Sequence, residues 1–432
     1  MRTLFSFLAL VILFGCKGIN PLKRTAISEA PSLRYLHALE AAELDKTALG
    51  ALWMKASERA LHDSISVTLP YSESGYFRGS EPDARSYSFI AQEGQVLTVN
   101  GSVLPKASPK VFTDLFVWRN KTWTTLAHGD SALNLTYEFT SRDTCLLRIQ
   151  PELLVDAYYT IGVSLTPVLI NPVAGAGNKS IGSFYGASRD GGKRKHEGVD
   201  IFARKGTLVI APTDGVVTRV GTSKLGGKVV WLQDFKRGHS FYFAHLDSQA
   251  VKKGMKLKQG EMVGTVGNTG NARFTPPHLH FGVYQSGAKD PLSYIQTLDR
   301  VAEALPWDTT FHPLAYRVVA KSVNLRNGPG EKHELTDKLM QNTFVRVIAE
   351  SSNWYRIALP DHRQGFVYKS LVGPITRGKK RKLKKPVTLL ASTSGESAPI
   401  TEVRHPSVEV LATFQNYLYV QTKDGQLGWM LP

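Results

Sequence analysis

The spacing of apolar residues changes character along the first part of the chain. Over residues 32–61 they recur at approximately helical intervals, and Ser32 is a candidate N-cap. Over residues 66–166, short runs that alternate apolar and polar positions are separated by Gly, Pro, Asn and Asp, which is typical of strands and turns. The pattern therefore predicts a helical N-terminal segment, 17–65, followed by a β-sandwich, 66–168.

Glycine and short β runs dominate the next stretch, residues 171–295. The segments 206–221 and 251–267 each predict a strand, a tight turn and a second strand. We therefore expect a further β domain over 169–300. The same pattern occurs in lipoyl- and biotinyl-type barrels, but those present a modifiable Lys at a hairpin tip, and this sequence has no such tip. The strand order of the preceding sandwich resembles that of small jelly-roll domains.

The last third of the chain contains an internal repeat. Residues 345–367 align without a gap with residues 408–430, at an offset of 63. Two copies of one small fold follow from this alignment. We predict barrels over 316–374 and 387–432, joined by a solvated basic linker, 375–386.

The first copy carries an additional motif, Val323-Asn-Leu-Arg-Asn-Gly-Pro-Gly330. Together with Trp354-Tyr-Arg and Gly365-Phe-Val, it resembles the bacterial SH3 module associated with cell-wall binding. The second copy lacks the Arg-x-Gly-Pro-Gly loop, so we interpret it as a structural partner without a ligand site of its own. The alternative is a pair of barrels whose aromatic residues only fill their cores.

Composition restricts the chemistry that the chain can support. Its 432 residues, 42% hydrophobic and 10% aromatic, fit several packed domains and exclude a disordered chain. Two cysteines exclude a disulfide scaffold and a Cys-rich zinc module, so any metal site must use His and carboxylate ligands. The formal net charge of +17 suits nucleic acid, an anionic membrane surface or a cell wall rich in carboxylates.

The N-terminus has the features of an export signal. Arg2 precedes an apolar run, residues 4–14, that is too short to span a bilayer as a helix, so we predict a signal peptide over 1–16. The ending Gly15-Cys16 resembles a bacterial lipobox, which implies a lipid on Cys16 and a lipoprotein of the cell envelope, in the periplasm or at the outer membrane. The alternative is a soluble secreted protein. Export removes nucleic acid as a natural partner.

Four segments of the glycine-rich region carry side chains typical of metal and catalytic sites. Residues i and i+2 of a strand face the same side, so both imidazoles of His278-Leu-His280 can reach one site. A His and a carboxylate four positions apart, as in His196-Glu-Gly-Val-Asp200, can supply two zinc ligands. The remaining segments are Phe243-Ala-His245-Leu and the turn Gly267-Asn-Thr-Gly270.

In order and spacing, these segments resemble the lysostaphin/LytM-type zinc metallopeptidases over about 125 residues. The resemblance implies a two-layer β fold of the duplicated hybrid motif type, bound Zn²⁺, and hydrolysis of the peptide part of bacterial peptidoglycan by a zinc-activated water. It assigns metal binding to His196, Asp200 and His280, and catalysis without metal binding to His245 and His278, whose individual roles stay open.

The sequence departs from that family at two positions. Gly282 stands where the family often has Glu, and Phe243 stands where Tyr is usual. Neither change removes a ligand. Glu197 is adjacent to a ligand on an extended segment, so we expect its side chain to point away from the metal.

These observations favour a mainly β, multidomain, exported zinc endopeptidase that cleaves peptide stems or cross-links of peptidoglycan. The two barrels would hold it on the wall and raise the local substrate concentration. The alternatives are a non-catalytic wall-binding regulator of other wall hydrolases and a structural anchor with a vestigial peptidase. The complete set of five His and Asp positions favours the enzyme. The oligomeric state does not follow from the sequence.

Overall fold

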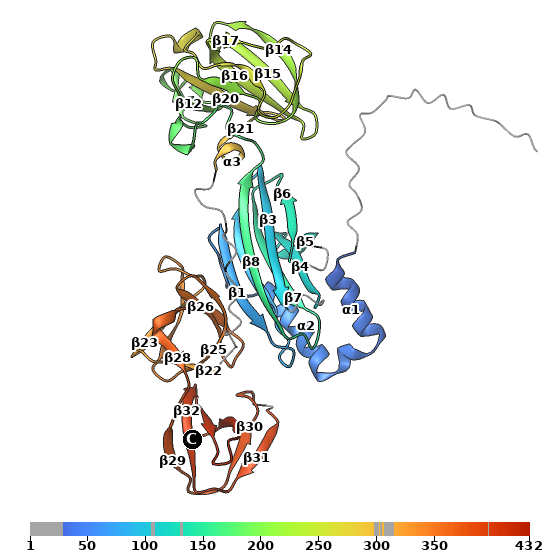
Figure 1. Ribbon diagram of the computed structural model, residues 1–432, viewed down its shortest axis with the longest axis vertical. Coiled ribbons are helices and arrows are strands. Elements are labelled where there is room, and N and C mark those ends of the chain that lie inside the picture. Colours follow the sequence, from blue (N-terminus) through green and yellow to red (C-terminus); the bar gives the residue numbers. More distant parts are fainter. Residues whose placement is uncertain are drawn as a thin grey trace, which may run out of the picture.

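The computed structural model describes residues 29–104, 109–129, 133–297, 302, 305, 315–395 and 397–432. Figure 1 shows an elongated, mainly β molecule, as predicted. The glycine-rich β domain, from β9 to β21 and called the middle domain below, lies at one end, and the second barrel lies at the other. The predicted signal over 1–16, with Cys16, lies outside the described residues. Within them, no helix is long and apolar enough to cross a membrane.

Two helices form the start of the described chain. They are α1 (Pro31–Ala41) and α2 (Ala48–Leu61), with the 3₁₀ turn η1 (Leu44–Lys46) between them. The predicted N-cap was wrong, because helix α1 already begins at Pro31 and the Ser32 hydroxyl instead donates to the Asp114 carboxylate of the next domain at 2.9 Å.

The β-sandwich is a jelly roll of two four-stranded sheets. Their strand orders are β1-β8-β3-β6 and β2-β7-β4-β5. Alternate side chains of both sheets fill the space between them, which is the reason for the period-2 pattern in the sequence. The strands are β1 (Tyr71–Phe77), β2 (Arg85–Ala91), β3 (Gln95–Leu104), β4 (Val111–Arg119), β5 (Thr122–His128), β6 (Leu135–Glu138), β7 (Asp143–Pro151) and β8 (Ala157–Pro167).

The middle domain has the two β layers that the resemblance implies. The larger sheet has the order β18-β14-β15-β16-β20-β12-β9, with β21 beside β20, and the smaller one has the order β13-β19-β17. Short helical turns η2 (Asn178–Ser180), η3 (Asp190–Gly192) and η4 (Gly270–Ala272), and helix α3 (Leu292–Ile295), lie in the connections. The strands are β9 (Ile181–Ser183), β10 (Ser188–Arg189), β11 (Arg194–Lys195), β12 (Val199–Phe202), β13 (Leu208–Ile210), β14 (Gly215–Ser223), β15 (Gly227–Asp234), β16 (His239–Leu246), β17 (Ser248–Gln249), β18 (Lys256–Leu257), β19 (Met262–Thr265), β20 (His278–Tyr284) and β21 (Ala288–Lys289).

Two small barrels follow, and their central hairpins correspond at the offset of 63. The first barrel comprises β22 (Ala315–Val318), β23 (Ser322–Arg326), β24 (Leu335–Met340), β25 (Phe344–Ser351), β26 (Trp354–Ala358), β27 (Gln364–Tyr368), the turn η5 (Lys369–Leu371) and β28 (Val372–Pro374). The second comprises β29 (Lys379–Lys382), β30 (Val387–Leu390), β31 (Pro399–Val403), β32 (Ser407–Phe414), β33 (Tyr417–Gln421) and β34 (Leu427–Met430).

The structure corrects the predicted linker over 375–386. Lys379–Lys382 form strand β29, which pairs antiparallel with β32 and is the end strand of the second barrel's sheet. The charge run had suggested a solvated connection, but an end strand with exposed side chains tolerates the same composition, because it needs only backbone hydrogen bonds on one side.

The first barrel is joined to the jelly roll by backbone pairing. Strand β25 continues the jelly-roll sheet beyond β1, with Ala349 opposite Gly75. The Ser66 amide donates to the carbonyl of Asn327 at 2.7 Å, so the Arg-x-Gly-Pro-Gly loop contacts the jelly roll. This loop, which suggested a wall-binding site on the first copy, is therefore partly covered by the chain itself.

A buried charge pair crosses the same junction. Arg356 of the first barrel and Glu73 of the jelly roll are both fully buried, with 3.6 Å between Nη1 of Arg356 and Oε2 of Glu73. The remaining acceptor capacity of Glu73 is used by the hydroxyls of Tyr71, Tyr87 and Tyr159, at 2.6 to 2.7 Å. Such a pair is tolerated in a core because every charged group has partners.

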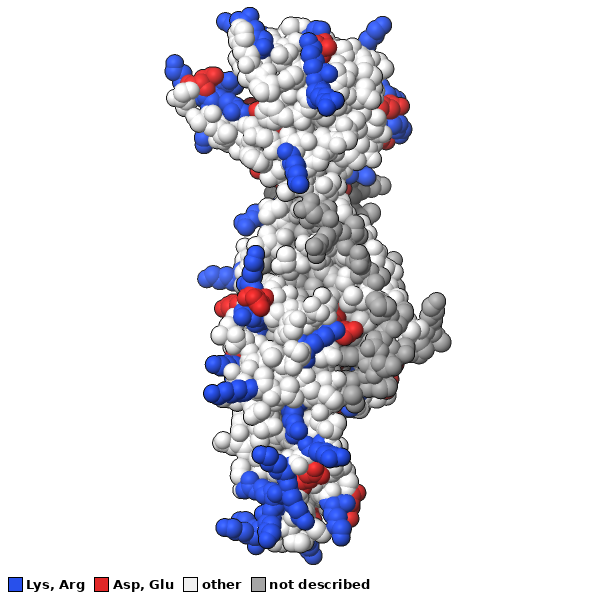
Figure 2. All heavy atoms as spheres, turned by 60° about the vertical axis from the view of Figure 1, so that its left-hand side comes forward, with Lys and Arg blue, Asp and Glu red and all other residues white. Residues whose placement is uncertain are grey.

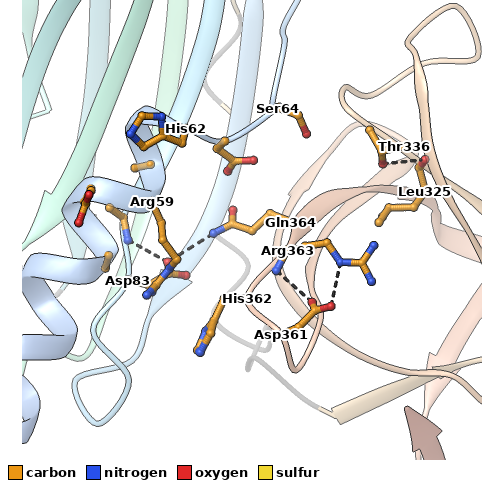
Figure 3. A pocket seen from close by; sticks show the side chains of 15 residues that line it. Arg59, His62, Ser64, Asp83, Leu325, Thr336, Asp361, His362, Arg363 and Gln364 are labelled. Atoms are coloured by element: carbon orange, nitrogen blue, oxygen red, sulfur yellow. Dashed lines mark hydrogen bonds and ion pairs between the residues drawn. The ribbon is translucent and has the colours of Figure 1, made fainter. Parts of the chain in front are cut away.

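A pocket of about 450 Å³ lies beside this junction, between α2 and the β26–β27 hairpin (Figure 3). Arg363 on the barrel side is already engaged by the carboxylates of Asp361 and Asp337, at 2.8 and 2.7 Å. Gln364 donates across the junction to Asp83 at 3.3 Å. The pocket is therefore walled by groups that connect the two domains, and none of the candidate zinc or catalytic residues lines it.

Candidate metal centre

Two neighbouring strands of the middle domain position the candidate ligands. Asp200 on β12 is directly opposite His280 on β20 in the antiparallel ladder. Directly opposite side chains lie on the same face of a sheet, about 4.5 to 5.5 Å apart at Cβ. His196 lies in the segment that leads into β12. The strand register thus brings together residues that are 80 positions apart in the sequence.

The ligand-type atoms of these residues converge. His196 Nε2 lies 3.0 Å from Asp200 Oδ1 and 2.9 Å from His280 Nδ1, and the latter two atoms are 3.1 Å apart. His196 and Asp200 are buried, and His280 is half-buried. Two imidazole nitrogens and one carboxylate oxygen are a donor set that Zn²⁺ prefers in catalytic sites, so the residues fit this metal. In the described part of the chain, these three residues form the one metal-type cluster of His, Cys and carboxylate side chains.

A second layer of contacts orients the ligands. His196 Nδ1 lies 2.9 Å from the carbonyl oxygen of Phe184, which leaves Nε2 for the site. Arg189 on β10 donates from Nη2 to Asp200 Oδ2 at 2.8 Å and to Ser183 Oγ at 2.7 Å. One carboxylate oxygen of Asp200 therefore faces the imidazoles while the other is held by a guanidinium.

Electrostatics favour the protonation states that metal binding needs. Burial alone would raise the pKa of Asp200, but hydrogen bonds with His196 and His280 outweigh burial and hold this pKa well below its usual range. Burial lowers the pKa of His280 and so favours its neutral imidazole. An ionised carboxylate and neutral imidazoles are the forms that bind a cation.

His245 and His278 lie beside this cluster with their rings fixed by backbone carbonyls. Nδ1 of His245 lies 2.9 Å from the Thr269 carbonyl, and Nδ1 of His278 lies 2.9 Å from the Pro276 carbonyl. Because a carbonyl only accepts, each Nδ1 carries the proton, and each Nε2 of a neutral ring is a free acceptor. The ring centroids are 5.0 Å apart, and His278 Nε2 lies 4.0 Å from Asp200 Oδ1.

His245 has two further features typical of functional positions. Burial, assisted by nearby His278 and His280 and opposed by the hydrogen bond to the Thr269 carbonyl, lowers its pKa to about 4, so the ring is neutral at physiological pH. Its φ of 61° is in the left-handed region, which costs a non-glycine residue about 1 to 3 kcal/mol. The backbone strain lies at the end of β16, where the side chain turns toward the cluster.

The two departures from the family pattern have local explanations. A Cβ on Gly282 would lie 2.8 Å from the Tyr284 ring and 3.1 Å from the Glu197 carbonyl oxygen, so a side chain at this position would require the Tyr284 ring to move. Phe243 is fully buried in the core, where a phenol oxygen would need a partner. Glu197 is exposed and accepts from the Tyr284 hydroxyl at 3.4 Å, which agrees with the expectation that it points away.

Sequence reasoning did not identify Arg189. Its segment, residues 183–195, has no regular periodicity, and Arg189 is one of four basic residues in it, so no local signal distinguishes it. Only the pairing of β10 with β11, with Arg189 opposite Arg194, places its side chain against Asp200. The five site residues predicted from sequence are all gathered at this centre, and their roles stay predictions.

Comparison with known proteins identifies two parts of the chain. Residues 194–291 match peptidase family M23, and residues 321–373 match the bacterial SH3 domain. The chain is 34% identical over 131 residues to the L-Ala--D-Glu endopeptidase of Bacillus subtilis, which covers 27% of this chain and 40% of that protein. It is 36% identical over 94 residues to the peptidoglycan DD-endopeptidase ShyC of Vibrio cholerae. This match covers 22% of this chain and 21% of that protein.

Among solved structures, the chain resembles the catalytic domain of lysostaphin from Staphylococcus simulans. The identity is 34%, the match covers 26% of this chain and 89% of that one, and the TM-score is 0.24. The chain spans less than half the length of both curated relatives named above.

Proposed function

The chain contains a peptidase domain of family M23 followed by a bacterial SH3 domain, and from this premise we propose an exported zinc endopeptidase that hydrolyses peptide stems or cross-links of peptidoglycan. The observation that carries the proposal is the convergence of His196 Nε2, Asp200 Oδ1 and His280 Nδ1 within 3.1 Å of one another. The names of the two curated relatives, both endopeptidases, support the substrate class.

His196, Asp200 and His280 would hold the zinc ion. Bound there, zinc supplies a Lewis acid that polarises the scissile carbonyl and acidifies a water. Arg189 holds Asp200 in place by engaging the carboxylate oxygen that faces away from the imidazoles. The Phe184 carbonyl fixes the tautomer of His196, so that its Nε2 is the donor atom.

The two remaining histidines provide proton transfer. Nδ1 of His245 and Nδ1 of His278 each lie 2.9 Å from a backbone carbonyl, which selects the neutral tautomer whose Nε2 can accept a proton. Either ring can accept a proton from the attacking water and return it to the leaving amine, a type of assistance worth about 10² to 10⁴-fold. A ring that becomes protonated also stabilises a developing oxyanion.

Export and a lipid on Cys16 are part of the proposal, supported by the sequence of residues 1–16. An envelope location would place a protein of net charge +17 next to the anionic wall. The rival function, a non-catalytic regulator of other wall hydrolases, makes a different prediction, since such a protein needs neither zinc nor hydrolysis.

The test is mass spectrometry of fragments released from purified peptidoglycan by the zinc-loaded full chain. We expect shortened stems or uncoupled dimers from the unchanged protein. His280→Ala should lose both zinc and fragment release, whereas the matched control His37→Ala, an exposed histidine on α1, should keep both.

Arg189→Gln should weaken zinc binding and fragment release less than His280→Ala does, because it removes only a contact that orients Asp200. Loss of a contact that orients a ligand typically lowers metal affinity or activity about 10- to 100-fold. Zinc content is measured in parallel by elemental analysis. A protein that holds one zinc yet releases no fragment, or one that holds no zinc, would contradict the proposal and favour the regulator.

A further inference from the structure

A dense run of like charges lies on the second barrel, at the opposite end of the molecule from the strands β12 and β20 of the metal centre. Seven of the nine residues from Arg377 to Lys385 are Lys or Arg, and all seven side chains are exposed. Figure 2 shows the blue side chains gathered at this end of the molecule. We call residues 377–385 the basic strand segment; its central part is β29.

The cations of this segment are not neutralised by the fold. Within the described residues, none of the seven side chains makes an ion pair, whereas the cations of the middle domain often do, for example Lys258 with Asp214 at 2.8 Å. Glu409 is opposite Lys380 in the ladder, but its carboxylate accepts from the Gly378 amide at 2.5 Å. Charged residues commonly protect the edge of a sheet and keep a terminal repeat soluble. Neither role requires seven charges of one sign without ion-pair partners.

The strand presents these charges on both of its faces. Consecutive side chains of a strand point to opposite sides, so Lys379 and Arg381 lie on one face and Lys380 and Lys382 on the other. Same-face cations are about 6.6 to 6.8 Å apart along the strand. A barrel strand normally has one face turned inward, but here all four side chains are exposed.

Because the strand carries charges on both faces, it suits some anionic partners better than others. A flat bilayer surface would engage only one side of the strand, whereas the chains of a polymer network can contact both. Within the segment, no exposed apolar side chain stands beside the charges to enter a bilayer. Leu383, the one apolar residue of the segment, packs against the core of the second barrel instead.

We propose that the basic strand segment binds the carboxylates of the peptidoglycan network and is the wall-binding element of this chain. This inference rests on the proposed function, because the wall is taken to be the substrate. It also exchanges the roles expected of the two barrels: the first, whose motif loop contacts the jelly roll, connects domains, and the second provides the docking surface.

Cosedimentation of the zinc-free full chain with purified peptidoglycan sacculi tests this assignment, since without zinc the sacculi stay intact. The test variant K379Q/K380Q/R381Q/K382Q removes four charges from β29. The control K55Q/K252Q/K253Q/K256Q removes four exposed lysines without ion pairs from α2 and the middle domain, so both proteins carry the same net charge.

We expect the test variant to bind sacculi about tenfold more weakly or worse, because four exposed charge contacts are lost together. The control should bind like the unchanged protein. Binding should fall between 50 and 500 mM NaCl, since the Debye length shortens from roughly 14 Å to 4 Å. R377Q/K384Q/K385Q, which leaves β29 intact, should give an intermediate loss and guards against a folding defect in the first variant.

Two further arms identify the ligand. Sacculi whose carboxylates have been converted to amides should no longer bind the protein, and vesicles of anionic phospholipid should bind it less than sacculi do. Equal pelleting of the test and control variants, full binding to amidated sacculi, or stronger binding to vesicles would overturn the assignment.

Wall binding by β29 and hydrolysis at the metal centre can be tested separately. Zinc-loaded K379Q/K380Q/R381Q/K382Q should cleave soluble peptide fragments of peptidoglycan at the unchanged rate, because β29 is at the opposite end of the molecule from β20, the strand that carries His280 (Figure 1). Loss of sacculus binding with retained cleavage of soluble fragments supports the inference. Loss of both activities would show that β29 is not a separate docking element.

Discussion

The two barrels use the same face to dock onto different neighbours. Phe366 and Ala349 of the first barrel belong to the core of the jelly roll. Their equivalents 63 positions later, Trp429 and Ala412, belong to the core of the first barrel. The backbone contacts at the equivalent positions differ, because Glu350 pairs antiparallel with Ser74 of the jelly roll, whereas its equivalent Thr413 makes an isolated parallel bridge with Thr343 of the first barrel.

The chemistry of the two interfaces nevertheless differs. The first barrel places the charged Arg356 at its interface, and the second places Tyr419 at the equivalent position, where its ring lies 4.8 Å from that of Phe344. The initial strands differ even more, since three residues of β22 are half-buried and one is buried, whereas β29 is entirely exposed and cationic. A repeat can thus reuse equivalent core side chains for docking while the backbone contact and the surface that faces solvent change.

The largest expected effect comes from the charged interface. Arg356→Met leaves Glu73 as an uncompensated buried charge, so the free energy of unfolding of the jelly-roll and first-barrel unit should fall by about 3 to 5 kcal/mol. Tyr419→Met, the equivalent change in the second barrel, should cost less because no charge is stranded. Urea titration followed by tryptophan fluorescence measures both, and equal losses would contradict the distinction.

A slightly smaller effect is expected from the paired aromatic residues. Phe366→Ala and Trp429→Ala each create a cavity at an interface and should each cost about 3 kcal/mol. Amide hydrogen exchange shows which strands each substitution destabilises. Phe366→Ala should speed exchange in β1 and β25, and Trp429→Ala should speed exchange in β32 and β25. If Trp429→Ala also loosened β1, the two interfaces would not be independent.

Glycines in the two equivalent loops should respond differently to substitution. A Cβ on Gly328 would lie 2.2 Å from the Ser66 carbonyl oxygen, whereas one on Gly395 would meet no atom within 4 Å. Gly328→Ala should therefore destabilise the docked unit by about 1 to 3 kcal/mol. Gly395→Ala should stay within about 0.5 kcal/mol of the unchanged protein. Thermal unfolding compares the two variants directly.

The smallest effect concerns pH. Burial lowers the pKa of His333 and of His362 in the first barrel from 6.5, with the positive charges of Arg326 and Arg59, respectively, acting in the same direction. Below about pH 6.5 the unfolded chain therefore binds more protons than the folded one, and stability should fall as the pH falls. Unfolding at pH 7.5 and 5.5 should show this slope, and H333Q/H362Q should flatten it.

Local patterns in the sequence predicted much of the molecule. Alternating apolar residues over 66–166 were sufficient for a sandwich, whose jelly-roll order the sheets confirm. The repeat at offset 63 was sufficient for two related barrels. The Lys-rich run at 377–385 was misinterpreted as a linker, because local composition does not reveal whether backbone hydrogen bonds have a partner strand.

The sequence by itself predicted the candidate zinc ligands, because the spacing of His and Asp allows metal binding and the order of the motifs resembles that of the lysostaphin/LytM-type metallopeptidases. It could not determine that Asp200 is opposite His280, that Arg189 holds the second oxygen of Asp200, or that the motif loop of the first barrel contacts Ser66. These arrangements join positions up to about 260 residues apart. They depend on strand register and on which surfaces become buried. Both are fixed only when distant segments of the chain pack against one another.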